Sequence, residues 1–170
     1  MNLASVKRTA KRGSMLIETV IGTGVLAVAI PLVTGALAES AKSGMSAAAE
    51  TRSPWMISAC MAEIQASRDG KSQFFTPTAI HQTLPPAGDV WALAFTADGL
   101  AIGKLNPAEY QRGTGRLHGQ SVRYIAYFTS TEAIAKHGPP PMLRTHIAIE
   151  YPAASPVNKR HKIDFHTLIP

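Results

Sequence analysis

The sequence predicts an α+β protein in which a long N-terminal helix leads into a small antiparallel β-sheet. Residues 19–38 are twenty residues without a charge, which predicts a long apolar helix. From residue 90 onward the chain alternates apolar and polar side chains over short segments, which predicts strands. Apolar residues also recur at helical spacing over residues 55–68, so the C-terminal half of the helix is expected to cover the sheet.

The N-terminal region has the pattern of a membrane anchor. As a helix, the uncharged run would rise about 1.5 Å per residue, or roughly 30 Å, which matches the hydrocarbon thickness of a bilayer. A leader over residues 1–13 precedes it, with no acidic residue and four basic ones: Lys7, Arg8, Lys11 and Arg12. This asymmetry predicts a single-pass protein of the inner membrane, with a cytoplasmic N-terminus and an exported C-terminal domain.

One acidic residue, Glu18, lies near the start of the apolar segment. A carboxylate in the bilayer centre costs at least about 2.5–3.5 kcal/mol on insertion scales, so an acid inside a membrane segment implies a partner. The alternative is that Glu18 lies at the membrane interface among headgroups and water, with no specific role. The basic leader and Gly13 in front of Glu18 favour an assembly role.

Residues 12–38, which read RGSMLIETVIGTGVLAVAIPLVTGALA, resemble the N-terminus of type IV pilins and pseudopilins. The resemblance rests on a basic leader ending in Gly13 and on Glu18 as the fifth residue after it. It implies that a prepilin peptidase cuts between Gly13 and Ser14, that the new N-terminus is methylated, and that Glu18 pairs with the Ser14 amine of a neighbouring subunit. Two positions depart from the family: Ser14 replaces the usual Phe, and Pro31 lies closer to the Glu than in many pilins.

Two other fates of this segment stay open. Residues 36–38 read Ala-Leu-Ala, a small-x-small sequence of the kind that ordinary signal peptidase recognises, and cleavage there would release a soluble chain starting at Glu39. Against this, the apolar segment exceeds the roughly 7–15 residues of a signal-peptide core and would contain Glu18. An uncut membrane anchor is the third alternative.

Composition indicates one domain plus the anchor. The net charge of +6 is misleading, because the leader holds four of the seventeen basic residues and the remaining thirteen face eleven acidic ones. No nucleic-acid partner is therefore expected. Cys60 is the only cysteine, so no internal disulfide can form, and we expect it to be a small buried apolar residue.

The helix is expected to continue over residues 39–70. Gly44 weakens it, and Ser53-Pro54 has the form of an N-cap followed by proline, so we expect a kink or interruption between Gly44 and Pro54. Asp69-Gly70 should end the helix. Its buried side is expected to carry one line of apolar residues, with Trp55 nearby: Met56, Cys60 and Ile64.

The C-terminal half is expected to be β. Residues 71–89 contain three prolines and no period, so they predict a long connection anchored by Phe74 and Phe75. Asp98-Gly99 predicts a hairpin turn, and residues 104–119 predict a loop. Four or five antiparallel strands with one apolar face are expected, over residues 90–95, 100–103, 121–130, 143–151 and 162–168.

No enzymatic motif is present. The six histidines lack metal-ligand spacing, and the glycine-rich stretch 113–119 fits no phosphate-binding pattern, so it is expected to be a flexible loop. We expect no catalytic residue, no metal and no cofactor. The acidic residues of this half are scattered along the sequence and predict no paired-carboxylate site: Asp89, Asp98, Glu109, Glu132, Glu150 and Asp164.

A finer resemblance extends over the C-terminal half. FTADGLAIG, YQRGTGRLHGQSVRYIAYF and HIAIEYPAASPVNKRHKIDFHTLIP follow one another in the order found in a pilin-like family called Verru_Chthon cassette protein B. Both resemblances imply a minor pseudopilin, a structural subunit of a type IV pilus or a type II secretion-like filament, with the prepilin peptidase, other pilin-like subunits and the inner membrane as partners. The alternative is a membrane-anchored or exported binding module that uses loop 74–86 or loop 113–119.

Overall fold

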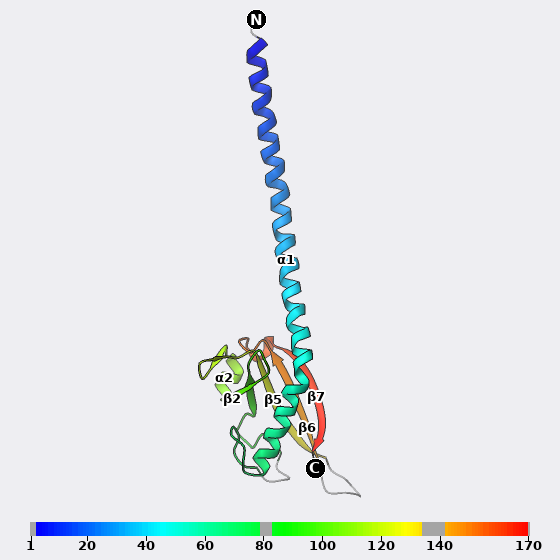
Figure 1. Cartoon of the computed structure of the whole chain (residues 1–170), viewed down its shortest axis with the longest axis vertical. Helices are drawn as coiled ribbons and strands as arrows, with labels where there is room; N and C mark the ends of the chain where they lie inside the picture. The colour runs from blue at the N-terminus through cyan, green and yellow to red at the C-terminus, as the bar shows by residue number, and fades with distance from the viewer. Residues whose placement is uncertain (1–2, 79–82, 134–141, 170) are drawn as a thin grey trace. The chain divides into compact units, whose positions relative to one another are not determined.

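The computed structural model describes the backbone of residues 3–78, 83–133 and 142–169, and the side chains from residue 16 onward within these ranges, except at 132, 133 and 142. The chain divides into two compact units, residues 1–47 and residues 48–170, which we call the N-terminal segment and the head domain. Helix α1 (Leu3–Arg68) forms the N-terminal segment and continues into the head domain (Figure 1). The α+β class is confirmed: a long apolar N-terminal helix precedes an antiparallel sheet, an architecture like that of pilins.

The expected interruption of the helix is wrong, since α1 continues through both Gly44 and Pro54. Pro54 has no N–H, so it cannot donate the usual helical hydrogen bond to the carbonyl of Glu50, four residues earlier. The Ser53 hydroxyl donates to this carbonyl at 2.8 Å and replaces the missing bond. Ser53 therefore repairs a continuous helix and does not start a new one.

The end of α1 is where the sequence placed it. Gly70 has a φ of 69°, the left-handed conformation that glycine adopts freely. The Lys71 N–H donates to the Ala66 carbonyl at 2.7 Å and the Gly70 N–H to the Ser67 carbonyl at 3.1 Å. These two bonds close the last turn as a Schellman motif.

The head domain contains a five-stranded sheet in the order β2-β1-β5-β6-β7, with every neighbouring pair antiparallel. All five predicted strands are confirmed, with ends that differ by a few residues. The predicted turn joins the first two strands, and Gly99 in it has a φ of 79°. The strands are β1 (Ala92–Phe95), β2 (Ala101–Lys104), β5 (Tyr124–Ala133), β6 (Met142–Tyr151) and β7 (His161–Ile169).

The C-terminal part of α1 packs on one face of this sheet, as expected. The predicted line of Met56, Cys60 and Ile64 is buried against side chains of all the long strands. Phe75 is also buried and stacks on Trp91 with ring centroids 4.3 Å apart, so it anchors the connection that follows α1. Trp55 contradicts the prediction, because it is 76% exposed on the outer side of the helix.

The opposite face of the sheet is covered as well, which corrects the expectation of one apolar face. A second core joins outward side chains of β1 and β5 to residues of two segments, one between β2 and β5 and one after β6. In it, Tyr110 stacks on Tyr127 with ring centroids 5.0 Å apart. Its fully or nearly fully buried members are Ala92, Ala94, Leu105, Tyr110, Val122, Ile125 and Ala153. The head domain is therefore layered on both sides of the sheet.

The predicted loop 104–119 is in fact structured. It contains helix α2 (Pro107–Arg112) and strand β3 (Arg116–Leu117), which pairs with β4 (Gln120–Ser121). Because 113–119 includes β3 and most of the β3–β4 turn, the expectation of a flexible loop is corrected too. A short 3-10 helix, η1 (Val157–Lys159), lies between β6 and β7. Residues 136–141, which include Pro139, Pro140 and Pro141, lie outside the described part of the chain.

Candidate functional site

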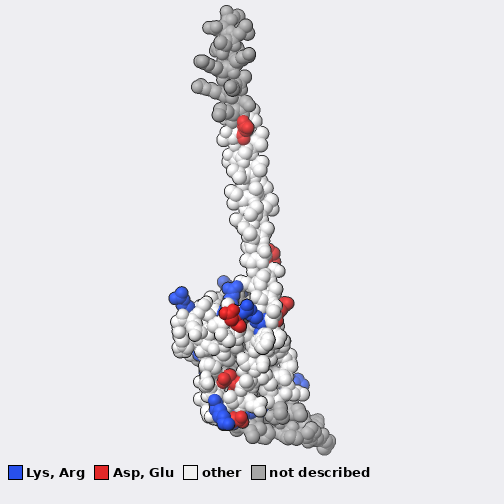
Figure 2. All heavy atoms as spheres, viewed as in Figure 1, with Lys and Arg blue, Asp and Glu red and all other residues white. Residues whose placement is uncertain are grey.

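The N-terminal segment exposes a continuous apolar surface. Its eleven large apolar side chains between Leu16 and Leu37 are each 57–68% exposed. Figure 2 shows this stretch of helix almost free of charged side chains. Leu16–Arg68 is long and apolar enough to cross a membrane by length and composition. Soluble monomers rarely leave so much apolar surface uncovered, so this surface requires lipid or other protein around it.

Glu18 interrupts that surface near its N-terminal end. Its side chain is exposed, and helical spacing places Gly22, Val25 and Ala29 on the same side of the helix. Within the described residues no hydrogen bond or ion pair of Glu18 is found.

The residues of the expected processing site lie in the helical part of the chain. Gly13 and Ser14 are within α1, as are the four leader residues Lys7, Arg8, Lys11 and Arg12. The side chains of residues 1–15 lie outside the described part of the structure. The spacing of four residues between Ser14 and Glu18 is close to one helical turn, so both positions lie at the same end and on the same side of α1.

The polar side chains described within the apolar run are compatible with a membrane. Thr23 donates to the Thr19 carbonyl at 2.8 Å, and Thr34 donates to the Ile30 carbonyl at 2.9 Å. Hydrocarbon offers no hydrogen bonds, so hydroxyl groups in a membrane helix need such internal acceptors. A side chain added at Gly22 or Gly35 would meet no atom within 4 Å, so the helix surface is open at both positions.

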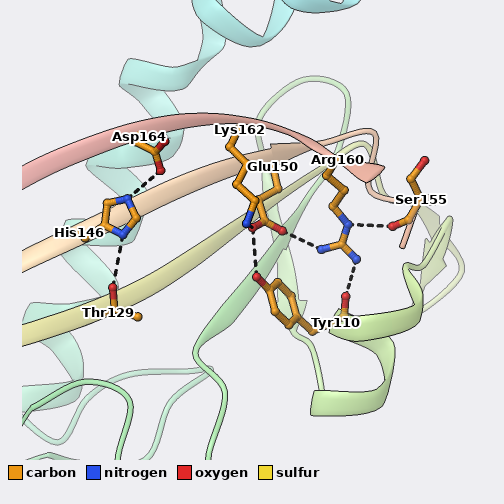
Figure 3. A network of polar contacts seen from close by, with 8 residues as sticks. All are labelled: Tyr110, Thr129, His146, Glu150, Ser155, Arg160, Lys162 and Asp164. Carbon is orange, nitrogen blue, oxygen red and sulfur yellow. Dashed lines mark hydrogen bonds and ion pairs between the residues drawn. The ribbon is translucent and has the colours of Figure 1, made fainter. Parts of the chain in front are cut away.

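Sequence reasoning missed a buried polar cluster in the head domain (Figure 3). Glu150 on β6 is fully buried and accepts from Arg160 at 2.8 Å, from Lys162 at 2.8 Å and from the Tyr110 hydroxyl at 3.0 Å. Arg160 also donates to the carbonyls of Ser155 and Tyr110. The arginine therefore ties α2, β6 and the segment before β7 together.

This cluster has a structural role, because its fully buried charges, Glu150 and Arg160, compensate each other and the second cation, Lys162, is partly exposed. Burial, and then the neighbouring Glu150 carboxylate, raise the pKa of Tyr110, so its hydroxyl stays protonated and donates at all ordinary pH values. Both oxygens of Glu150 have partners, and all three guanidinium nitrogens of Arg160 donate to groups within the domain. No acceptor or base remains free in it for a reaction.

A second polar group lies on the exposed part of the same sheet face. His146 on β6 contacts Asp164 on β7 with 2.7 Å between Nε2 and Oδ1 (Figure 3). The His146 ring also stacks on His166, with ring centroids 4.7 Å apart. Asp164 is half exposed. The described residues contain no group of three or more potential metal-ligating side chains.

Cys60 and Asp89 are two further groups with shifted pKa values. Burial raises the pKa of the Cys60 thiol, so it stays protonated and unreactive on the inner side of α1. For Asp89, burial alone would raise the pKa, but hydrogen bonds from Lys104 and the Val90 N–H and the Lys104 charge lower it. Both groups have structural explanations.

Comparisons with protein-family models, with curated proteins and with solved structures find no match for this chain.

Proposed function

We propose that this chain is a pilin-like structural subunit, a minor one as its resemblance implies, which is cut after Gly13 and assembled through α1. The observation that carries the proposal is the exposed apolar helix with one acidic residue, Glu18, four residues after Ser14. The filament is a type IV pilus or a type II secretion-like pseudopilus. Before assembly the protein crosses the inner membrane once, with its N-terminus in the cytoplasm and the head domain exported.

The apolar surface of α1 suits both the membrane-inserted subunit and the subunit assembled in a filament. In the membrane, lipid covers the large side chains between Leu16 and Leu37. In a filament, neighbouring α1 helices replace the lipid, and the open surfaces at Gly22 and Gly35 permit close approach of helices. The same surface is used twice, and so no second hydrophobic site is required.

Glu18 supplies the specificity that apolar packing lacks. Cleavage after Gly13 creates a positively charged amine at Ser14, and the carboxylate of Glu18 on one subunit pairs with this amine on the next. Because an unpaired carboxylate among apolar helices is costly, the pair selects one axial register between subunits. A carboxylate in the first turns of the new helix is also stabilised by the positive end of the helix dipole.

Intact mass and N-terminal sequence of protein purified from its native membrane test the processing step. The proposal expects a chain that starts at Ser14, with or without an added methyl group. A start at Glu39 indicates a soluble exported domain, and a start at Met1 indicates a plain anchor. Either of the latter results would favour the rival function, a binding module with no filament role.

Replacement of the acid tests the assembly step. Co-expressed with the prepilin peptidase and the filament system of its host, Glu18→Ala should still be cut but should be missing from sheared, sedimented filaments. Glu39→Ala is the matched control, because it removes an exposed acid at the other end of the apolar run and should assemble normally. Normal assembly of Glu18→Ala would contradict the register role.

A further inference from the structure

One end of the head domain carries an excess of positive charge. Two segments build this end, residues 105–123 with α2 and the β3–β4 hairpin, and residues 150–162 with η1. Together they hold six basic and two acidic residues. Figure 2 shows blue side chains at the upper end of the head domain in that view. We call this surface the basic end.

The two segments are held together by main-chain contacts. The Thr114 N–H donates to the Ala153 carbonyl at 2.9 Å, and the Arg160 guanidinium donates to the carbonyl of Tyr110. At Gly113, a side chain would collide with the main chain of Ser155, so the close approach depends on glycine at this position. The basic end is therefore a rigid surface and not a pair of independent loops.

The acidic residues of the basic end are already used. Glu109 accepts from the Asn106 N–H in the capping box of α2, and Glu150 is buried with Arg160 and Lys162. Four exposed basic side chains remain, and within the described residues none of them forms an ion pair: Arg112, Arg116, Arg123 and Lys159. Their charge is thus available to a partner.

The chain enters the head domain at this same end. Arg52, in the first turn of α1 that belongs to the head domain, contacts Asp98 in the β1–β2 turn at 3.1 Å. That turn lies at the end of the sheet where β5 begins, since Phe95 pairs with Tyr124. The Arg123 N–H donates to the Phe95 carbonyl at 2.8 Å, which puts the basic end beside it.

Only residues 39–47 separate the apolar run from the head domain. As helix they span about 14 Å, while the headgroup layer of a bilayer is roughly 5–8 Å thick on each side. With a Debye length of about 8–10 Å in physiological salt, charges tethered at this distance act on a membrane surface. The tether also gives the basic end a high effective concentration at that surface.

We propose that the basic end of the head domain binds the anionic phosphate headgroups of the membrane that holds α1. The contact is made by Arg112, Arg116, Arg123 and Lys159, and it keeps the unassembled subunit lying against the bilayer. It rests on the membrane anchoring of the proposed function but not on filament formation. Assembly would break the contact, because the subunit must then leave the bilayer.

Energy transfer in proteoliposomes tests this contact with the full-length chain. A donor dye is placed on η1 through Asn158→Cys, an exposed position, while Cys60 is buried and stays unlabelled. Acceptor dye is carried by a trace of headgroup-labelled lipid. The vesicles are phosphatidylcholine alone, or phosphatidylcholine with roughly one third phosphatidylglycerol as the anionic lipid. Flotation first establishes that the protein is inserted, so that a failed anchor is recognised separately.

Transfer should be higher in the anionic vesicles than in the neutral ones. The difference should disappear in about 1 M salt, where the Debye length falls to about 3 Å. Arg112→Gln/Arg116→Gln should lose most of the difference. Lys71→Gln/Arg144→Gln is the matched control, because it removes two exposed charges from the opposite end of the head domain and should keep the difference.

Three results would overturn the proposal. The first is equal transfer in both vesicle types. The second is an equal loss in the two double variants, which would mean that net charge and not the basic end governs the effect. The third is binding of duplex DNA by the detergent-solubilised chain, lost in Arg112→Gln/Arg116→Gln, with no dependence on lipid. That result would assign the basic end to a nucleic acid.

Discussion

At the scale of single residues, replacement of the fully buried carboxylate of Glu150 is expected to cause a large loss of stability. Replacement by Gln leaves the Arg160 guanidinium buried with no opposite charge, and breaking such a pair costs about 3–5 kcal/mol. We therefore expect Glu150→Gln to lower the free energy of unfolding by that amount, measured by denaturant titration of the detergent-solubilised chain.

Asp164→Asn is the control for that measurement. It also removes a carboxylate that contacts a basic side chain, His146. Here, however, the Asp164 side chain is half exposed and the His146 side chain is partly exposed. Exposed pairs contribute about 0–1 kcal/mol, so this variant should unfold almost like the unaltered chain. Equal losses in the two variants would mean that the buried pair contributes no more to the free energy of unfolding than the exposed one.

Asp89 provides a test by pH. Its folded-state pKa lies below the ordinary value of 3.8, so its contribution to stability is complete above that pH and is lost as the pH falls through the lower, folded-state pKa. Asp89→Asn removes the charge from a 2.6 Å contact with Lys104, and we expect a loss of about 1–2 kcal/mol at pH 7.

The difference between Asp89→Asn and the unaltered chain should shrink as the pH is lowered below 3.8, and it should vanish below the folded-state pKa of Asp89, where both side chains are neutral. Urea unfolding at a series of pH values measures it. Asp98→Asn is the comparison, since Asp98 is 79% exposed and should give no measurable change at any pH. A pH-independent loss for Asp89→Asn would exclude the ionic explanation.

Some residue environments could be predicted from the sequence and others could not. The line of Met56, Cys60 and Ile64 follows from helical spacing alone, and burial confirms it. Trp55 is only one position away from Met56, but that step turns it about 100° around the helix, away from the sheet. The burial of Glu150 depends on its pairing with Arg160, which lies ten positions later. No local sequence pattern predicts a pairing over that distance.

At the scale of elements, Ser53 shows how α1 tolerates Pro54. Its hydroxyl supplies the donor that proline lacks, so Ser53→Ala should leave the Glu50 carbonyl with one bond fewer and destabilise the head domain by about 1 kcal/mol. Thermal unfolding measures the change. Ser58→Ala, at an exposed position one turn further along, should have little effect. If Pro54→Ala is also present, the loss from Ser53→Ala should decrease, because the backbone donor has returned.

Helix α2 was predictable but was missed. Asn106-Pro107-Ala108-Glu109 has the spacing of a capping box with proline in the first turn, and both reciprocal bonds are present. The helix has only six residues, too few to show a 3.6-residue period. The glycines around it therefore gave the stronger signal, and they indicated a loop. Likewise, the β3–β4 hairpin has strands of two residues, which are too short to alternate.

At the scale of the whole molecule, the sequence predicted the architecture because its long-range signals are strong. Twenty uncharged residues and strands of nine or ten residues in β5, β6 and β7 leave little choice of class. The second core was missed because Ala92, Ala94 and Ile125 read as the ordinary outward side of strands. That side of the sheet is buried because α2 and the segment after β6 fold over it.

The two units should also be separable in experiment. Every buried residue of the two cores lies at or after Ala49, so the N-terminal segment contributes no side chain to either core among the described residues. A fragment of residues 48–170 should therefore be soluble and fold alone. Its unfolding midpoint, measured by circular dichroism, should lie within about 2 °C of that of the full-length chain in mild detergent.

A shorter fragment, residues 57–170, is the control, because it lacks Ala49, Ser53 and Met56. Loss of a buried Met alone costs about 2–5 kcal/mol, so the unfolding midpoint of this fragment should fall by at least about 8 °C. If the longer fragment were unfolded or aggregated while the full-length chain stayed folded, the N-terminal segment would have to stabilise the head domain directly. It would then be more than an anchor and an assembly surface.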